Sequence, residues 1–353
     1  MHAPLRLGVI GCGYVAAAAH LPVLSDLPEV QVAAICDHDP GRLAGIGDRF
    51  CVSRRHVDAS ELIADPAVEA VGVFVPPGHH APPAIAALEA GKHVLVEKPL
   101  ALSLADADDL VSTASVSPGV ATVGFNLRSL DLVRRARELV SAGELGQIEG
   151  LRTTLSSNRR FDRNAPEWRR RRELGGGSLI EQGIHHFDLW RYLLGSEVDV
   201  LFALAHDEDA GAAVTARLSD GVLVQTTLSE RTTPMHSVDI LGTEASVRLA
   251  LTHFDGFELL PANREDSAPP VRARRALATL RGLPRAVADL RRGGHFSHSY
   301  AEQWRRFAAA VRRGEPMAPT FEDGRRAVAI SIAAVHSASS GAPVRLEDVV
   351  AAR

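Results

Sequence analysis

The chain contains 353 residues, of which 46% are hydrophobic, and its formal net charge is −4. This length exceeds what a single hydrophobic core usually fills, so we expect two domains. The weakly acidic balance excludes nucleic acid as the main partner, and the absence of any apolar run as long as a membrane span excludes a membrane-spanning chain.

The cysteines and the N-terminal residues of the chain indicate the cellular compartment of the protein. Cys12, Cys36 and Cys51 show neither a disulfide framework nor the paired spacing of a metal site. The apolar residues after Arg6 loosely resemble a secretory leader, but glycines at positions 8, 11 and 13 interrupt them. We therefore expect no signal peptide and a cytoplasmic location.

The first part of the chain alternates short apolar strands with segments of helical spacing. Alternation of this kind predicts a parallel sheet with helices on both faces. We expect strands at residues 5–10, 31–37, 70–75, 93–96 and 120–125, and helices that include residues 14–25, 81–90 and 104–114.

A glycine-rich turn follows the first predicted strand. Residues 11–16 have the pattern G-x-G-x-x-A, in which Gly11 makes the turn, Gly13 lets a pyrophosphate approach the backbone, and the small Ala16 lets helix and strand pack closely. The helix that starts there offers free N–H groups to phosphates. Its position between a strand and a helix predicts dinucleotide binding.

The second predicted strand ends at Asp37, where a carboxylate binds the adenosine ribose hydroxyls. Its negative charge opposes a 2′-phosphate, so NAD is favoured over NADP. The neighbouring His38 and Arg42 weaken that preference, and NADP stays an alternative.

The stretch GKHVLVEKPL, residues 91–100, ends a predicted core strand on Glu97 and Lys98. Lys92 and Lys98 are the only lysines among 39 Lys and Arg residues. An ammonium group can be tuned by its surroundings, whereas a guanidinium stays charged, so a lysine here is either a functional group or a strand-end cation paired with Glu97. Ligands of open α/β sheets bind beyond the carboxyl ends of the strands, which favours a functional role for Lys98. Residues 76–80 follow the preceding strand, so we expect them to line the same crevice.

Longer strands joined by turns predict a different, antiparallel sheet in the second part, and such a sheet can leave one face free for a partner subunit. Residues 263–294 are rich in Arg, Ala and Pro and could form a basic amphipathic helix; we interpret them as a solvated surface excursion rather than a site for an anionic ligand. We expect strands at 147–156, 198–205, 212–218, 222–228, 236–241 and 246–251, and helices at 130–142, 297–312 and 322–337, the last capped by Thr320.

A second group of polar residues follows the glycines at 175–177. Ser178 is a candidate helix cap, and Glu181, His185 and Asp188 are spaced to project from one helix face. A carboxylate beside an imidazole raises its basicity and fixes its orientation, as a general base requires. One alternative is a metal site that also includes His186 or Asp188. The other is that His185 is a buried histidine whose hydrogen bonds are formed by neighbours on its own helix. We predict no metal, because no further ligand set with recognisable spacing appears.

These segments together resemble the Gfo/Idh/MocA family of dinucleotide-dependent oxidoreductases. The resemblance rests on residues 11–16, 76–80, 97–99, 124–128, 175–188 and 321–325, and thus spans nearly the whole chain. It implies an α/β protein: a Rossmann domain, residues 1–125, with a doubly wound parallel sheet, and a C-terminal α/β domain, residues 126–353, with a large, mostly antiparallel open sheet. The final helices are candidates to pack back on the first domain, and the open sheet implies a homodimer or homotetramer.

The resemblance also implies catalytic roles. It places the catalytic lysine at Lys98 and the catalytic histidine at His185, with Glu181 where many inositol-dehydrogenase-like members have Asp. It implies an NAD(P)-dependent oxidoreductase acting on a ring secondary alcohol or ketone of a sugar, cyclitol or sugar derivative. A redox-neutral NAD-dependent enzyme that cleaves or eliminates, and a non-catalytic dinucleotide sensor, are the alternatives.

The remaining expected site residues bind cofactor or substrate. For the cofactor we expect Gly11, Gly13, Tyr14, Val15, Asp37, His38, Pro76, His80, Glu97 and Lys98. For the substrate we expect Asn126, Arg128, Trp168 and Arg169.

Overall fold

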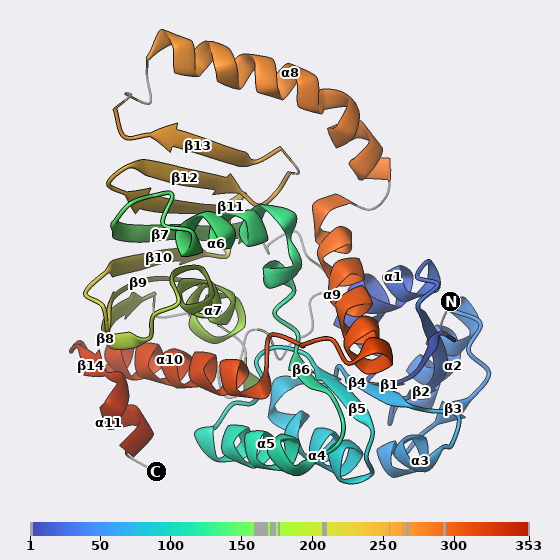
Figure 1. The fold of residues 1–353 in the computed structure, drawn as a ribbon. Coiled ribbons are helices and arrows are strands. Elements are labelled where there is room, and N and C mark those ends of the chain that lie inside the picture. The colour runs from blue at the N-terminus through green and yellow to red at the C-terminus, as the bar shows by residue number, and fades with distance from the viewer. Residues whose placement is uncertain are drawn as a thin grey trace.

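Two β-sheets organise the chain, one parallel and one mostly antiparallel (Figure 1). The computed structural model describes residues 3–158, 169, 174–175, 177–206, 210–253, 255–263, 265, 268–291 and 294–351. The expected fold class is confirmed, and with it the change from a parallel to a mostly antiparallel sheet along the chain.

The first sheet is parallel and has the order β3-β2-β1-β4-β5-β6. Because the order reverses between β1 and β4, a crevice opens beyond the carboxyl ends of these strands. The strands are β1 (Leu5–Ile10), β2 (Val30–Cys36), β3 (Arg55–His56), β4 (Ala70–Val73), β5 (His93–Val96) and β6 (Ala121–Val123). The helices around them are η1 (Ala16–His20), α1 (Leu21–Ser25), α2 (Pro40–Arg49), α3 (Ala59–Ala64), η2 (Pro77–His79), α4 (Ala81–Glu89) and α5 (Leu104–Val116).

The second sheet follows η3 (Asn126–Ser129) and α6 (Asp131–Ser141), and its order is β13-β12-β11-β7-β10-β9-β8-β14. Among the strand pairs that the structure describes, β7 and β10 run parallel and the others antiparallel. The strands are β7 (Ile148–Asn158), β8 (Val198–Ala205), β9 (Gly211–Leu218), β10 (Leu223–Ser229), β11 (Arg231–Gly242), β12 (Ala245–Ala250), β13 (Phe257–Pro261) and β14 (Val344–Arg345).

One face of the second sheet is covered and the other is open. Helices α6, α7 (Gly183–Leu194) and α10 (Phe321–Ser340) pack against the covered face. Along β9 the side chains alternate, so that Val214 is buried and its neighbours Ala213 and Thr215 are exposed. This period-2 pattern is that of a sheet with one solvated face.

The last long helices pack partly against the first half of the chain. Trp304 and Phe307 of α9 (Gly294–Arg313) are fully buried in the same core cluster as Leu5 and Leu7 of β1. Thr320 forms a complete capping box with Asp323 at the start of α10, which confirms the predicted cap. The chain ends on the short helix α11 (Leu346–Ala351).

The arginine-rich segment forms a long helix, α8 (Pro269–Arg291), beyond β13 at the edge of the second sheet (Figure 1). Leu277, Leu280 and Leu283 are exposed on it. The segment is therefore a surface helix, and it lies away from the crevice of the first sheet. In the part of the chain that the structure describes, no helix has both the length and the apolar character needed to cross a bilayer.

Candidate active site

A cavity of about 1530 Å³ lies at the carboxyl ends of β1, β2, β4 and β5. Its opposite wall comes from the second half of the chain: the end of β7, the helical turn η7 (Ser178–Gln182), the start of α7, and α9. The site is therefore built between the two sheets. Neither half alone encloses it.

The glycine-rich turn forms one end of this cavity. Gly11 has φ +95°, and a Cβ there would lie 2.7 Å from the carbonyl carbon of Phe74, so only glycine fits. A Cβ on Gly13 would meet no atom within 4 Å, because that position faces the cavity. The backbone from residue 14 to 25 is helical and begins beside this open space. The arrangement fits the pyrophosphate of a dinucleotide.

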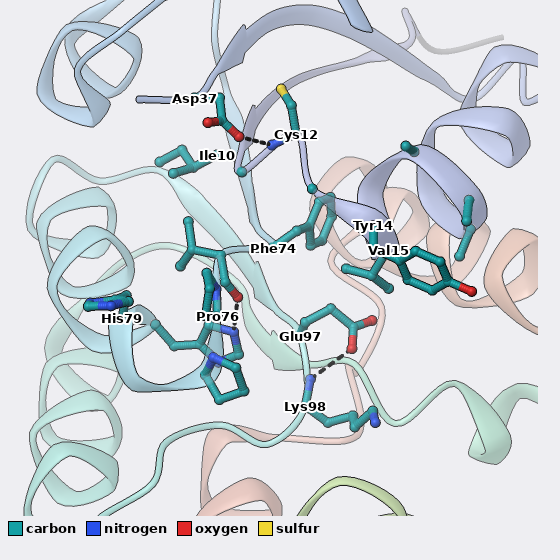
Figure 2. A pocket seen from close by; sticks show the side chains of 18 of the residues that line it. Ile10, Cys12, Tyr14, Val15, Asp37, Phe74, Pro76, His79, Glu97 and Lys98 are labelled. Carbon is teal, nitrogen blue, oxygen red and sulfur yellow. Dashed lines mark hydrogen bonds between the residues drawn. The ribbon is translucent and has the colours of Figure 1, made fainter. Parts of the chain in front are cut away.

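Asp37 is fixed at the end of β2 by a network of hydrogen bonds. Its carboxylate accepts from the backbone N–H of Cys12 at 2.9 Å, which Figure 2 shows, and from that of Asp39 at 2.9 Å. Arg42 Nη1 lies 3.2 Å from both carboxylate oxygens. The carboxylate can accept ribose hydroxyls, while the guanidinium beside it offsets part of its charge. The side chain of His38 is 91% exposed at the rim.

Lys98 reaches across the cavity to the second half of the chain. Its Nζ donates to the backbone carbonyl of Glu181 at 2.9 Å and lies 3.7 Å from that residue's Oε1. Arg169 Nη2 lies 3.3 Å from the same Oε1. The Glu181 carboxylate is thus held between two cations, which orient it and leave it ill-suited to serve as the base.

His185 lies one helical turn beyond Glu181 and also lines the cavity. Burial lowers its pKa well below the ordinary value, and the charge of Lys98 lowers it further. Its Nδ1 is buried and has no hydrogen-bond partner among the described residues, so the ring nitrogen available to a ligand is Nε2. A neutral imidazole near a lysine ammonium can accept a proton at neutral pH.

Asp188 is not the partner of His185 that the spacing suggested. Arg128 donates to both of its oxygens, with Nε at 2.8 Å from Oδ2, and Asp323 lies 3.2 Å from the same guanidinium. A bidentate guanidinium satisfies a buried carboxylate better than an imidazole on the same helix does. The expected raising of His185 basicity by Asp188 is therefore wrong.

Two of the expected substrate residues lie outside the cavity. Arg128 is committed to its ion pairs, and Asn126 donates to the hydroxyl of Ser299 at 2.8 Å. Neither lines the cavity among the described residues, and this placement argues against contact with substrate. Arg169 does line it, whereas Trp168 lies outside the residues that the structure describes.

The described glycines before α7, Gly175 and Gly177, have different roles. Gly175 has φ +93°, and a Cβ there would lie 2.9 Å from Pro77 of η2, so the glycine lets the second half approach the cofactor side. The predicted cap at Ser178 is wrong: Gly177 is the N-cap, and the buried Ser178 hydroxyl has no partner in the described part of the chain.

His80 joins two loops at the cavity wall. Its Nδ1 lies 2.8 Å from the carbonyl oxygen of Pro99 and its Nε2 lies 2.9 Å from that of Val75. A neutral imidazole has one N–H, so the ring donates to one of these carbonyls while its other nitrogen faces the second. His80 thus lies between the segments that follow β4 and β5, and both of its nitrogens face backbone rather than a ligand. The other expected cofactor residues, Tyr14, Val15, Pro76 and Glu97, line the same cavity.

Several lining residues were not expected from the sequence. They are Tyr300 and Phe296 of α9, together with Ser157, Asn158 and Gln182. They are far in sequence from the glycine-rich turn and carry no motif. The one available signal was rarity, because the chain has three tyrosines and two of them, Tyr14 and Tyr300, face the cavity.

Comparison with known proteins places both halves in one group. Residues 5–125 match the model of an oxidoreductase family with an NAD-binding Rossmann fold, GFO_IDH_MocA, and residues 133–248 match the GFO/IDH/MocA C-terminal domain. The chain is 30% identical over 361 residues to myo-inositol 2-dehydrogenase of Thermotoga maritima, which covers 98% of this chain and 100% of the relative.

Solved structures agree with this match. A probable dehydrogenase from Thermotoga maritima has a TM-score of 0.78 at 27% identity and covers 98% of this chain and 100% of its own. GenD2 from gentamicin A biosynthesis, solved in complex with NAD, has a TM-score of 0.80 at 26% identity, with 98% and 97% covered.

The position of Arg128 predicts a stability effect. In Arg128→Met the buried Asp188 loses its partner, and we expect the free energy of unfolding to fall by about 3–5 kcal/mol while the KM for substrate changes little. Urea denaturation with parallel kinetics measures both.

A double variant is the control. Arg128→Met with Asp188→Asn removes the unpaired charge as well, and we expect it to recover part of the lost stability. A raised KM without loss of stability in Arg128→Met would instead support a role in substrate binding.

Proposed function

The chain belongs to the Gfo/Idh/MocA family of NAD-binding oxidoreductases, and from this premise we propose that it transfers hydride between NAD and a ring carbon carrying a secondary alcohol or ketone. The substrate is a sugar, a cyclitol or a sugar derivative. The observation that carries the proposal is that Lys98, Glu181 and His185 line the same cavity as the glycine-rich turn. Residues 1–125 bind the dinucleotide, and residues 126–353 supply the substrate wall.

Each residue of this group has a distinct task in the proposed reaction. The Lys98 ammonium holds the substrate hydroxyl and stabilises negative charge on its oxygen. His185 takes the hydroxyl proton at Nε2 during oxidation and returns it during reduction. Bound NAD supplies the hydride acceptor. Glu181, by its carbonyl and carboxylate, keeps Lys98 in place.

The lining of the second half supports a polyhydroxylated ring as substrate. Ser157, Asn158 and Gln182 offer hydroxyl and amide groups that can both donate and accept hydrogen bonds. Tyr14 and Tyr300 add flat surfaces for the apolar faces of a ring. The relative from Thermotoga maritima, named for a cyclitol, supports the same class.

We also propose that the protein is a cytoplasmic homodimer or homotetramer assembled through the open sheet. Large apolar side chains are exposed on strands of this sheet, including Leu223 at 59%, Met235 at 51% and Leu241 at 45%. Removing them from water favours association of sheet faces.

The experiment that tests the function measures reduced nicotinamide by absorbance. Purified protein is mixed with NAD⁺, then NADP⁺, against inositols, aldoses and nucleotide sugars. A signal with one of these establishes net dehydrogenation and identifies the ring. Confirmed dinucleotide binding with silence across the panel, followed by cleavage of glycosides without net nicotinamide reduction, would contradict the proposal in favour of redox-neutral chemistry.

Lys98→Met should abolish turnover, because it removes the cation that stabilises charge on the substrate oxygen. Affinity for NAD should stay within a few-fold. Steady-state rates and NAD titration measure the two effects. Lys92→Met is the matched control, since Lys92 Nζ donates to the backbone carbonyls of Asp65 and Val68 and does not line the cavity. Normal rates in Lys98→Met would remove the proposed mechanism.

The pH dependence of alcohol oxidation should reflect His185. The base must be neutral, and its lowered pKa keeps it neutral at pH 7 and below. We therefore expect the acid limb of the kcat/KM profile to lie at a pH lower than 6.5, the ordinary pKa of histidine. His185→Gln should lose this limb together with most of the rate; a limb that persists unchanged in that variant belongs to another group.

Asp37 and Arg42 should change the cofactor preference in opposite directions. Asp37→Ala removes the ribose acceptor and the charge that repels a 2′-phosphate, so it should weaken NAD binding and narrow its advantage over NADP. Arg42→Ala leaves the carboxylate charge less offset and should widen that advantage. Dissociation constants for both dinucleotides measure the ratio; an unchanged ratio in Asp37→Ala excludes Asp37 as the ribose ligand.

A further inference from the structure

His20 is a buried imidazole that has no part in the mechanism described so far. It is the last residue of η1, directly behind the glycine-rich turn, and it is 0% exposed. Its ring stacks on Phe74 at a centroid distance of 3.9 Å and meets Tyr300 edge-on at 4.8 Å. A polar ring enclosed by aromatic rings needs specific partners for both nitrogens.

Both nitrogens have such partners, and these fix the tautomer. The indole Nε1 of Trp304 lies 3.1 Å from His20 Nδ1. Because an indole N–H can only donate, Nδ1 accepts and carries no proton. The proton is then on Nε2, which lies 2.9 Å from Glu97 Oε1 and donates to it. The direction of each hydrogen bond follows from Trp304.

Glu97 receives this bond on one oxygen and the backbone N–H of Lys98 on the other, at 3.0 Å (Figure 2). Glu97 as a residue is 4% exposed, and a Cβ on Gly124 would lie 3.0 Å from its Oε1, so the carboxylate has little room to move. Burial raises the pKa of Glu97, whereas the hydrogen bond from His20, the charge of Lys98 and the backbone N–H of Lys98 lower it. Two hydrogen-bond donors and a neighbouring ammonium thus favour the ionised carboxylate.

We propose that Trp304, His20 and Glu97 form a hydrogen-bonded chain that holds an ionised carboxylate against the backbone N–H of Lys98 and so fixes the backbone that carries this side chain, which makes His20 a positioning residue for the reaction. This inference rests on the proposed function of Lys98. The chain joins three distant parts of the sequence, since His20 is 77 residues from Glu97 and 284 from Trp304. It thereby links the element behind the glycine-rich turn and a helix of the second half to the lysine.

The charged and titratable groups around Glu97 come from each neighbouring element. They are His20 of η1, Lys98 after β5, His80 at the start of α4 and Tyr300 of α9. The phenol of Tyr300 has a pKa raised well above its usual value, chiefly by burial, and stays neutral. The pKa of His80 is lowered by burial. His20 is thus the group that donates a side-chain hydrogen bond to Glu97 in the described structure.

The test compares His20→Phe with His20→Gln. Phenylalanine keeps a flat ring for stacking but cannot donate to Glu97, whereas glutamine offers both an N–H for Glu97 and an oxygen for Trp304. In His20→Phe we expect kcat to fall on the order of 10- to 100-fold, as when an outer partner of a functional group is lost. The KM for substrate and the Kd for NAD should stay within a few-fold.

The pH profile separates positioning from packing. Without its donor the buried Glu97 has a higher pKa, so in His20→Phe the protonation of Glu97 should add to that of His185 and move the acid limb of kcat/KM to higher pH. His20→Gln should restore most of the rate and the original limb, which belongs to His185. Trp304→Phe, which removes the N–H that fixes the tautomer, should shift rate and limb in the same direction by a smaller amount.

Two outcomes would overturn the inference. One is a folded His20→Phe protein with normal kcat and an unmoved limb; the other is equal impairment in the Phe and Gln variants, which indicates a packing role. Both leave the proposed function standing if Lys98→Met is inactive. Activity in Lys98→Met removes the function and this inference with it.

Discussion

The contact between Lys98 and Glu181 is the interaction on which the site depends. It joins the carboxyl end of β5 to η7, and thus the parallel sheet to the half of the chain that carries the second sheet. The Lys98 side chain is 12% exposed, so its ammonium needs partners, and here they include the carbonyl and the carboxylate of Glu181. Each half of the chain supplies one partner of this pair. The contact that closes the cavity therefore also places Lys98 near His185.

A second buried ion cluster holds three elements of the second half together. Arg128 follows the last strand of the first sheet, Asp188 lies on α7, and Asp323 lies at the start of α10. Removing Arg128 or Asp188 leaves the other as a buried charge without its main partner, so the cluster favours one arrangement of these elements. The spacing of His185 and Asp188 suggested a base and its carboxylate. In the structure Asp188 instead stabilises the fold through Arg128, and His185 lines the cavity.

Aromatic and small residues complete the interface where charges do not. Trp304 and Phe307 bury α9 against β1, and Gly175 lets the chain before η7 approach Pro77. With these contacts the second half covers the carboxyl ends of β4 and β5, where the polar residues of the first sheet are gathered. The cavity is consequently lined by cofactor groups on one side and by groups suited to a hydroxylated ring on the other.

The sequence by itself determined what depends on local pattern. The strand–glycine–helix order, the end of β2 at Asp37, the buried β5 before Lys98 and the Thr320 cap were all predictable, because turn geometry, apolar periodicity and caps involve neighbouring residues. Partner choice was not predictable. Tertiary packing decided that Asp188 binds Arg128 rather than His185, and that Ser178 does not cap its helix. It also decided that β10 lies parallel to β7, and that Tyr300 and His20 lie beside Lys98 and Glu97. Each of these outcomes depends on groups from distant segments that compete for the same buried space.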